Sequence, residues 1–162
     1  MNVLEEIASF NRNDYQRDNF DAFLRKINFS YSIPSIHVTG TNGKGSTCNY
    51  INNIYIASGR KVGLFISPCY ESLLDMIRVD NKFIDIEYVE QIYKNYKKYF
   101  DKYNLSNFEI TTFIAFSYFI DQQVDIAIIE CGMGGEIACH GSMLHGTKDL
   151  PPDKGQSPDS VP

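Results

Sequence analysis

The segment that most constrains the fold is a short apolar run that leads into a glycine-rich turn and then into a helical pattern. Residues 35–39 (SIHVT) have the length and apolar content of a buried strand, and residues 40–46 (GTNGKGS) follow directly. From Ser46 to about Ser58, apolar residues recur at helical spacing, and Gly59 stands where a helix C-terminal cap is expected. The sequence therefore predicts a strand, a glycine-rich loop and a helix in immediate succession.

This succession has the chemistry of a phosphate-binding loop. Phosphate is held by converging backbone N–H groups, by a close approach that a Cβ would hinder, and by positive charge, which Lys44 can supply. The loop departs from the standard pattern G-x-x-x-x-G-K-[ST], because Val38 replaces its first glycine and Gly45 separates Lys44 from Ser46. The alternative is a glycine-rich turn with an exposed lysine, but the flanking strand and helix favour phosphate. The predicted nucleotide-binding residues are Thr41, Asn42, Gly43, Lys44, Gly45, Ser46 and Thr47.

Elsewhere in the chain, strand patterns alternate with helix patterns. Strands are predicted over residues 62–66 and 125–129, and a small hairpin over 76–84. Helices are predicted over residues 3–10, 18–29, 85–103 and 108–121. Strands that are apolar on both faces and alternate with helices indicate an α/β fold, with a partial parallel sheet flanked by helices.

Two oxygen-bearing side chains follow predicted strands. Glu130 ends the strand over 125–129, and Ser67 ends the strand over 62–66. Open α/β sheets bind ligands at the carboxyl ends of their strands, and Mg²⁺ prefers oxygen ligands, so Glu130 is a candidate for Mg²⁺ on the nucleotide. Ser67 can reach the same edge. The alternatives are a solvated strand end for Glu130 and a simple turn residue before Pro68 for Ser67.

Composition bounds the remaining possibilities. The 162 residues, 43% hydrophobic and 22% charged, fit one globular domain. The net charge of -5 argues against a general nucleic-acid binder. No apolar run reaches the roughly 18 residues that span a bilayer, and the acidic N-terminus does not resemble a secretory signal. The four cysteines form no CxxC pair, so we expect reduced thiols in a cytoplasmic protein.

The last part of the chain has a different composition. Residues 140–162 contain four of the six prolines and few large apolar residues. Such a segment buries too little surface to offset its ordering entropy. We therefore predict a domain over residues 1–139 and a disordered tail over 140–162.

With these residues in place, the sequence resembles the folylpolyglutamate synthase/dihydrofolate synthase family of Mur-type ligases. The resemblance covers about residues 1–136 and rests on five motifs in order. They are residues 37–48 (HVTGTNGKGSTC), 59–68 (GRKVGLFISP), 77–80 (IRVD), 108–109 (FE) and 125–135 (DIAIIECGMGG).

The resemblance implies an ATP-dependent reaction in which a substrate carboxylate is phosphorylated and the amine of L-glutamate attacks the acyl phosphate to form an amide. It implies a catalytic Lys44 on the phosphates of ATP, and Ser67 and Glu130 on Mg²⁺. It implies small-molecule substrates, folate or dihydropteroate and L-glutamate, with Arg78, Phe108 and Glu109 as candidate substrate-binding residues. Taken alone, Arg78 would be a solvated hairpin residue, and residues 108–109 an ordinary helix start.

Three departures from the family pattern affect this expectation. Cys69 stands where the family usually has histidine, and residues 136–141 (EIACHG) replace an expected Asp-Ala-Thr-Asn segment. Family members are also much longer. We therefore expect an incomplete ligase that makes no amide bond alone. The alternatives are a nucleotide-binding fragment without ligase activity, or a non-folate Mur-type ligase; the Lys44-Gly45-Ser46 order favours the folate branch.

Overall fold

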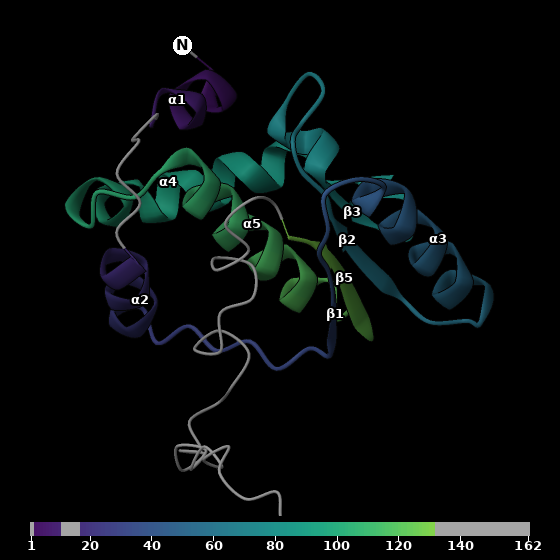
Figure 1. The fold of residues 1–162 in the computed structure, drawn as a ribbon. Coiled ribbons are helices and arrows are strands. Elements are labelled where there is room, and N and C mark those ends of the chain that lie inside the picture. The colour runs from purple at the N-terminus through teal and green to yellow at the C-terminus, as the bar shows by residue number, and fades with distance from the viewer. Residues whose placement is uncertain (1, 11–16, 132–162) are drawn as a thin grey trace, which may run out of the picture.

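The computed structural model describes residues 2–10 and 17–131, which form a sheet with helices on both faces (Figure 1). The helices are α1 (Val3–Ser9), α2 (Arg17–Lys26), α3 (Lys44–Ala57), the short 3-10 helix η1 (Leu73–Met76), α4 (Ile86–Lys102) and α5 (Asn107–Asp121). The strands are β1 (Ser35–Val38), β2 (Val62–Phe65), β3 (Ile77–Val79), β4 (Lys82–Phe83) and β5 (Ile126–Glu130). The predicted tail and the predicted boundary at residue 139 lie outside the described residues.

Strand order differs from chain order. The described strands run β1-β5-β2-β3-β4, so β5 lies between β1 and β2 and is parallel to both. β3 pairs antiparallel with β2, and β4 pairs antiparallel with β3. The predicted parallel sheet is confirmed for β1, β5 and β2. The predicted hairpin extends that same sheet, which makes the sheet mixed.

The turn of the hairpin explains how it is attached. Asp80 and Asn81 both have positive φ, 48° and 64°, as a tight two-residue hairpin turn requires. The Asp80 carboxylate accepts a hydrogen bond from the Val62 N–H at 2.9 Å, at the start of β2. Asn81 is hydrogen-bonded to the side chains of Asn52 and Asn53 on α3, at 2.7 and 3.0 Å. The hairpin is therefore held by both β2 and α3.

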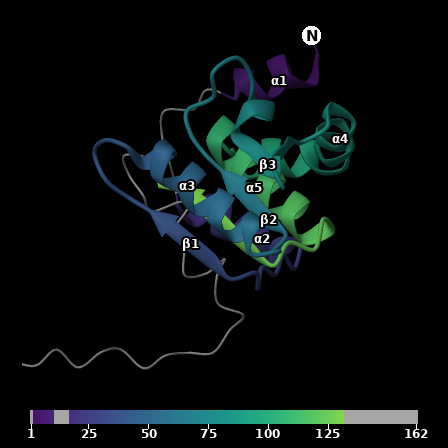
Figure 2. The ribbon, with the colours of Figure 1, turned by 90° about the vertical axis from the view of Figure 1, so that its right-hand side faces the viewer.

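Each face of the sheet has its own apolar cluster. On one face, Cys48 of α3 packs with Val62, Leu64 and Ile128. On the other face, α5 is buried over most of its length, and α1 and α4 contact it from outside. Figures 1 and 2 show α3 on one side of the sheet and α5 on the other. No helix of the described residues has the length and apolar character needed to cross a membrane.

Two predicted helix bounds shift for identifiable reasons. α3 begins at Lys44 rather than Ser46, because Gly43 adopts the left-handed conformation (φ 75°) and the chain turns helical directly after it. α2 ends at Lys26 rather than at residue 29. Asn28 has a φ of 52°, and the Phe29 N–H bonds the Leu24 carbonyl, so this helix ends in a left-handed C-terminal cap.

Candidate functional site

The loop between β1 and α3 places the start of a helix at the edge of the sheet. Gly43 is the N-terminal cap of α3, and glycine has no side chain to accept a hydrogen bond from the first turn. The N–H groups of a first helical turn have no acceptor within the helix, and they carry the positive end of the helix dipole. A Cβ at Gly43 would meet no atom within 4 Å, so the glycine is required by its φ of 75° rather than by space.

The Lys44 side chain turns back over this loop. Its Nζ donates to the Thr41 carbonyl at 3.4 Å and lies 4.0 Å from Oε1 of Glu130. Thr47 Oγ1 donates to the Gly43 carbonyl at 3.0 Å. Residues 41–43 and 46–47 are exposed, so their polar groups are accessible to a ligand.

Glu130 connects the loop to the neighbouring strand. Its Oε2 accepts a hydrogen bond from the Ser67 N–H at 3.2 Å, and it lies 3.5 Å from the position of a Cβ at Gly45. The predicted proximity of Ser67, Glu130 and Lys44 is confirmed. The physical reason is the sheet order, because β5 runs parallel between β1 and β2 and brings three strand ends to one edge.

Burial strengthens the interaction between the charged side chains at this edge of the sheet. The side chains of Lys44 and Glu130 are only 16% and 8% exposed, so their charges are weakly screened. The pKa of the Cys48 thiol is raised to about 11, first by burial and then by the negative charge of Glu130. In the described residues no three His, Cys, Asp or Glu side chains form a cluster that could hold a metal ion. The Mg²⁺ role of Ser67 and Glu130 stays a prediction.

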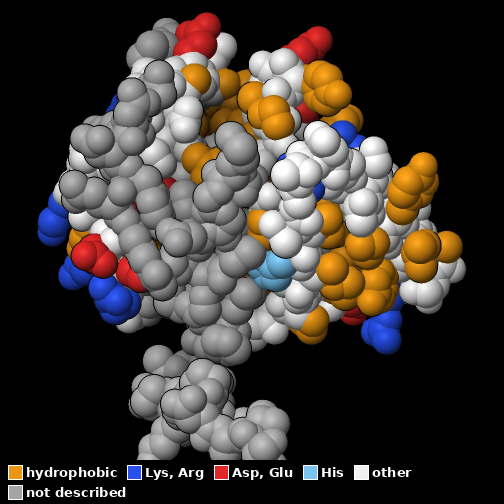
Figure 3. Space-filling model, viewed as in Figure 1, with side chains coloured by type: hydrophobic (Ala, Val, Ile, Leu, Met, Phe, Trp, Pro, Cys, Tyr) orange, Lys and Arg blue, Asp and Glu red, His pale blue; other side chains and the backbone are white. Residues whose placement is uncertain are grey.

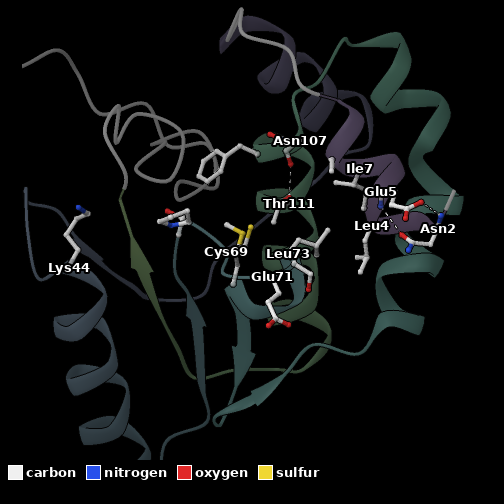
Figure 4. Close-up of a pocket in the computed structure, with 16 residues that line it drawn as sticks. Asn2, Leu4, Glu5, Ile7, Lys44, Cys69, Glu71, Leu73, Asn107 and Thr111 are labelled. Atoms are coloured by element: carbon white, nitrogen blue, oxygen red, sulfur yellow. Dashed lines mark hydrogen bonds between the residues drawn. The ribbon is translucent and has the colours of Figure 1, made fainter.

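A cavity of about 840 Å³ opens beside the loop, and Figure 4 shows Lys44 at one end of it and α1 at the other. Of the predicted residues, Lys44, Ser67 and Phe108 line it. Apolar side chains from α1 and η1 form much of the remaining wall. They are Leu4, Ile7, Leu73 and Met76.

The contribution of α1 was missed from the sequence. Its helical pattern was readable, but its packing depends on distant residues. The Phe10 carbonyl accepts a hydrogen bond from the Asn107 N–H at 2.9 Å, and Glu6 forms an ion pair with Lys97 at 2.8 Å. No local pattern indicates these contacts.

Two predicted substrate-binding residues lie away from the cavity wall. The Arg78 guanidinium lies 4.4 Å from the ring centroid of Phe83, within the hairpin. Glu109 is 2% exposed, and its Oε2 accepts hydrogen bonds at 2.7 Å from both the N–H and the hydroxyl of Ser106, which caps α5. The observed contacts of Glu109 stabilise the start of α5, which carries Phe108 into the cavity wall. The substrate roles of Arg78 and Glu109 stay predictions.

His37 lies on β1, within the strand that the sequence predicts over residues 35–39. Its Nδ1 is 3.6 Å from the Cys131 sulfur, and burial lowers the pKa of its imidazole. It does not line the cavity beside Lys44.

A glycine loop at a strand–helix junction, with a lysine and a carboxylate at the carboxyl edge of parallel strands, defines an α/β nucleotide-binding domain. No protein-family model matches the sequence. Individual proteins do match. Folylpolyglutamate synthase of Lacticaseibacillus casei is 37% identical over 108 residues, which cover 62% of this chain and 25% of that protein. Dihydrofolate synthetase of Saccharomyces cerevisiae is 33% identical over 108 residues, 65% of this chain and 25% of that protein.

The fold agrees with the sequence match. The structure of Mycobacterium tuberculosis folylpolyglutamate synthase complexed with ADP superposes with a TM-score of 0.74 at 30% identity. The superposition covers 82% of this chain and 32% of the M. tuberculosis chain. Over the matched part, the chain is similar to folylpolyglutamate and dihydrofolate synthases. It spans about a quarter of the length of the curated relatives it matches.

Proposed function

We propose that the chain is the nucleotide-binding portion of an ATP-dependent ligase that joins a folate or dihydropteroate carboxylate to the amine of L-glutamate through an acyl phosphate. The observation that carries the proposal is the convergence of Lys44, Glu130 and Ser67 beside the glycine-capped start of α3. The relatives named above are folate ligases, and one was solved with ADP.

The loop suits the phosphates of ATP. The first turn of α3 follows a glycine cap that has no side chain, and the Lys44 ammonium lies at the Thr41 carbonyl of the same loop. Among the described residues, Lys44 makes a long bond to the Thr41 carbonyl, at 3.4 Å, and a 4.0 Å approach to Glu130. Both contacts are weak enough for a phosphate oxygen to replace. We assign Thr41, Asn42, Gly43, Lys44, Gly45, Ser46 and Thr47 to the nucleotide.

The edge of the sheet suits Mg²⁺. Mg²⁺ is typically bound through one or two protein oxygens together with substrate phosphates and water. Glu130 and the Ser67 hydroxyl are the oxygens that we assign to it. When bound, Mg²⁺ would neutralise charge on the phosphates. Glu130 would then exchange its ion pair with Lys44 for the metal, which leaves Lys44 free for the phosphoryl group.

The cavity beside the loop suits the pterin-bearing substrate. Its wall combines the aromatic ring of Phe108 with Leu4, Leu73 and Met76, and it opens toward Lys44. A flat heterocycle can bury its faces against such a wall, while its carboxylate tail extends toward the phosphates. Phe108 would contact this substrate, and Glu109 would hold Phe108 in position through Ser106.

In this reaction Lys44 would stabilise the negative charge of the migrating phosphoryl group. Ligation also requires the acyl phosphate and the glutamate amine to be held together with water excluded. The matched part corresponds to about a quarter of the relative's length, and we propose that this part binds nucleotide but does not complete ligation alone.

Titration of the whole chain with ADP and with ATP, in the presence of MgCl₂, tests the proposal by calorimetry. We expect binding that weakens by at least about tenfold in Lys44→Ala, because a charge-assisted contact is lost. The matched control is Lys97→Ala, which removes the same charge from an exposed ion pair on α4. Binding that is absent, or equally affected by both substitutions, would count against the proposed site.

A ligation assay completes the test. The chain is incubated with ATP, Mg²⁺, glutamate and dihydropteroate or a folate, and product is measured. We expect no ligated product. Product at ordinary ligase rates, abolished by Lys44→Ala, would show that the chain is sufficient for catalysis.

The second candidate is a nucleotide-binding module without any role in ligation. The observation that favours it is that Arg78 and Glu109, two predicted substrate-binding residues, do not line the cavity. Binding of ADP without any binding of dihydropteroate or folate to the Phe108 cavity would favour this candidate.

A further inference from the structure

α3 carries a single charged residue, Lys44, and three asparagines further along its length. Figure 3 shows mainly hydrophobic and uncharged polar side chains over this helix, at the right of the molecule. Asparagine is unfavourable inside a helix, because its side chain competes with the helix for backbone hydrogen bonds. The bonds that these asparagines make therefore indicate what they contribute to the chain.

The first asparagine, Asn49, bonds a carbonyl in the first turn of α3. Its Nδ2 donates to the Gly45 carbonyl at 2.7 Å, and the residue is half-buried. Thr47 makes the same kind of bond two residues earlier. Its Oγ1 donates to the Gly43 carbonyl at 3.0 Å, and the Thr47 N–H bonds that carbonyl at 2.9 Å. Two carbonyls of the phosphate loop are thus held by side chains one turn further along the helix.

Each of these carbonyls shares a planar peptide unit with the N–H of the next residue. The Gly45 carbonyl is paired in this way with the Ser46 N–H, and the Gly43 carbonyl with the Lys44 N–H. Carbonyls point toward the C-terminus of a helix, and N–H groups point toward its N-terminus. A donor fixed on the carbonyl restrains the direction of the N–H at the opposite end of the unit and polarises it.

The bond from Asn49 is anchored further along α3. The Asn49 carbonyl accepts a hydrogen bond from Asn53 Nδ2 at 2.9 Å, and Asn53 Oδ1 accepts one from Asn81 Nδ2 at 3.0 Å. Asn81 Oδ1 accepts a bond from Nδ2 of the fully buried Asn52, at 2.7 Å. One line of side-chain amides therefore joins the phosphate loop to the hairpin turn. We call Asn49, Asn53 and Asn81 the asparagine ladder.

The first turn of α3 needs such a restraint because it contains Gly45. Glycine at this position leaves space for the Glu130 carboxylate, whose Oε2 lies 3.5 Å from the position of a Cβ. Glycine also has more backbone freedom than any other residue. The Asn49 bond opposes that freedom, because it adds a side-chain donor to the Gly45 carbonyl.

We infer that Asn49 is a positioning residue for phosphate binding, which orients the Ser46 N–H through the Gly45 carbonyl. The asparagine ladder holds Asn49 in place by tying its part of α3 to the hairpin turn. Asn49 itself does not contact the phosphate. The inference rests on the proposed function, which assigns Ser46 to the nucleotide.

A pair of substitutions of the same shape at Asn49 tests the inference. Threonine keeps a donor for the carbonyl four residues earlier, as Thr47 shows, whereas valine has no donor. The probe is ADP with MgCl₂, titrated into the whole chain. We expect Asn49→Val to bind ADP about three- to tenfold more weakly than the wild-type chain, the range of one lost neutral hydrogen bond. Asn49→Thr should bind ADP as the wild-type chain does.

The amide resonance of Ser46 gives a readout that does not depend on nucleotide. In ¹H–¹⁵N spectra of the unliganded chain, we expect this resonance to move in Asn49→Val, because the polarisation of the peptide unit is lost. In Asn49→Thr it should return toward its wild-type position. A merely structural role of Asn49 would lower the melting temperature without this difference between valine and threonine.

The matched control is Asn95→Val, which removes an exposed asparagine from α4. This variant should change neither the ADP affinity nor the Ser46 resonance. Thermal melting establishes that each variant is folded. If Asn49→Val does not fold, Asn49→Ala and Asn49→Ser provide the same comparison, because serine keeps a donor and alanine does not.

Three results overturn the inference. They are equal effects of Asn49→Val and Asn49→Thr on ADP binding, a Ser46 resonance that is the same in both variants, and a loss of affinity in Asn95→Val as large as that in Asn49→Val. Failure of the wild-type chain to bind ADP would contradict the proposed function. The Ser46 resonance would then decide whether Asn49 orients this N–H.

Discussion

Replacing Glu130 with glutamine should separate two opposite effects of this carboxylate on nucleotide binding. In the unliganded chain, Glu130 Oε1 lies 4.0 Å from the Lys44 Nζ. Two unit charges at that distance interact by about 4 kcal/mol at an effective dielectric constant of about 20. The net contribution is smaller, about 1 kcal/mol, because both side chains must be desolvated.

Without Mg²⁺, Glu130→Gln should therefore tighten ADP binding. The substitution frees Lys44 for the phosphates and removes the repulsion between carboxylate and phosphate. A gain of about 1.4 kcal/mol corresponds to tenfold in affinity, so we expect a gain of between about threefold and tenfold. The glutamine amide oxygen can still accept the 3.2 Å hydrogen bond from the Ser67 N–H, so the fold should persist.

With Mg²⁺, Glu130→Gln should instead weaken ADP binding relative to the wild-type chain. The wild-type chain should bind ADP more tightly when the metal is added, whereas Glu130→Gln should gain little because it has lost the carboxylate ligand. Calorimetric titrations in EDTA and in MgCl₂ measure both effects. The control is Glu6→Gln, which removes an equal charge from the 2.8 Å ion pair with Lys97. Undiminished Mg²⁺ dependence in Glu130→Gln would refute the assignment of Glu130 to the metal.

Three further predictions concern stability and reactivity. Gly63→Ala should destabilise the chain by about 1–3 kcal/mol in urea unfolding. The added Cβ would lie 2.7 Å from the buried Phe119 ring. Unchanged stability would show that β2 and α5 can separate readily. Ser106→Ala should cost about 0.5–2 kcal/mol by loss of the α5 cap, and a smaller effect would indicate that the Glu109 carboxylate caps the helix without the hydroxyl. At pH 8, exposed Cys69 should be alkylated rapidly. Buried Cys48, with a pKa raised to about 11, should be alkylated only when the chain unfolds. Peptide mass spectrometry distinguishes the two cysteines, and equal alkylation rates would contradict the burial of Cys48.

The local units of the fold follow from residues that are close together in the sequence. The strand, glycine loop and helix around Lys44 were predictable, because a short apolar run, positive-φ glycine and helical periodicity each act within a few residues. The hairpin over residues 76–84 was predictable for the same reason. The convergence of Ser67, Glu130 and the loop followed from one general rule, that parallel strands end at a common edge.

The packing of these units depends on contacts between residues that are far apart in the chain. The hairpin joins the main sheet through bonds from Asp80 to Val62 and from Asn81 to α3, which link residues far apart in the chain. α1 forms a cavity wall through contacts with α4 and α5 that no local pattern encodes. Glu109 could be read from sequence as a helix-start acid, but only packing shows that it is buried and bonded to Ser106. Periodicity reports which face of an element is apolar, whereas the choice of partner for that face depends on the free energy of the whole packed core.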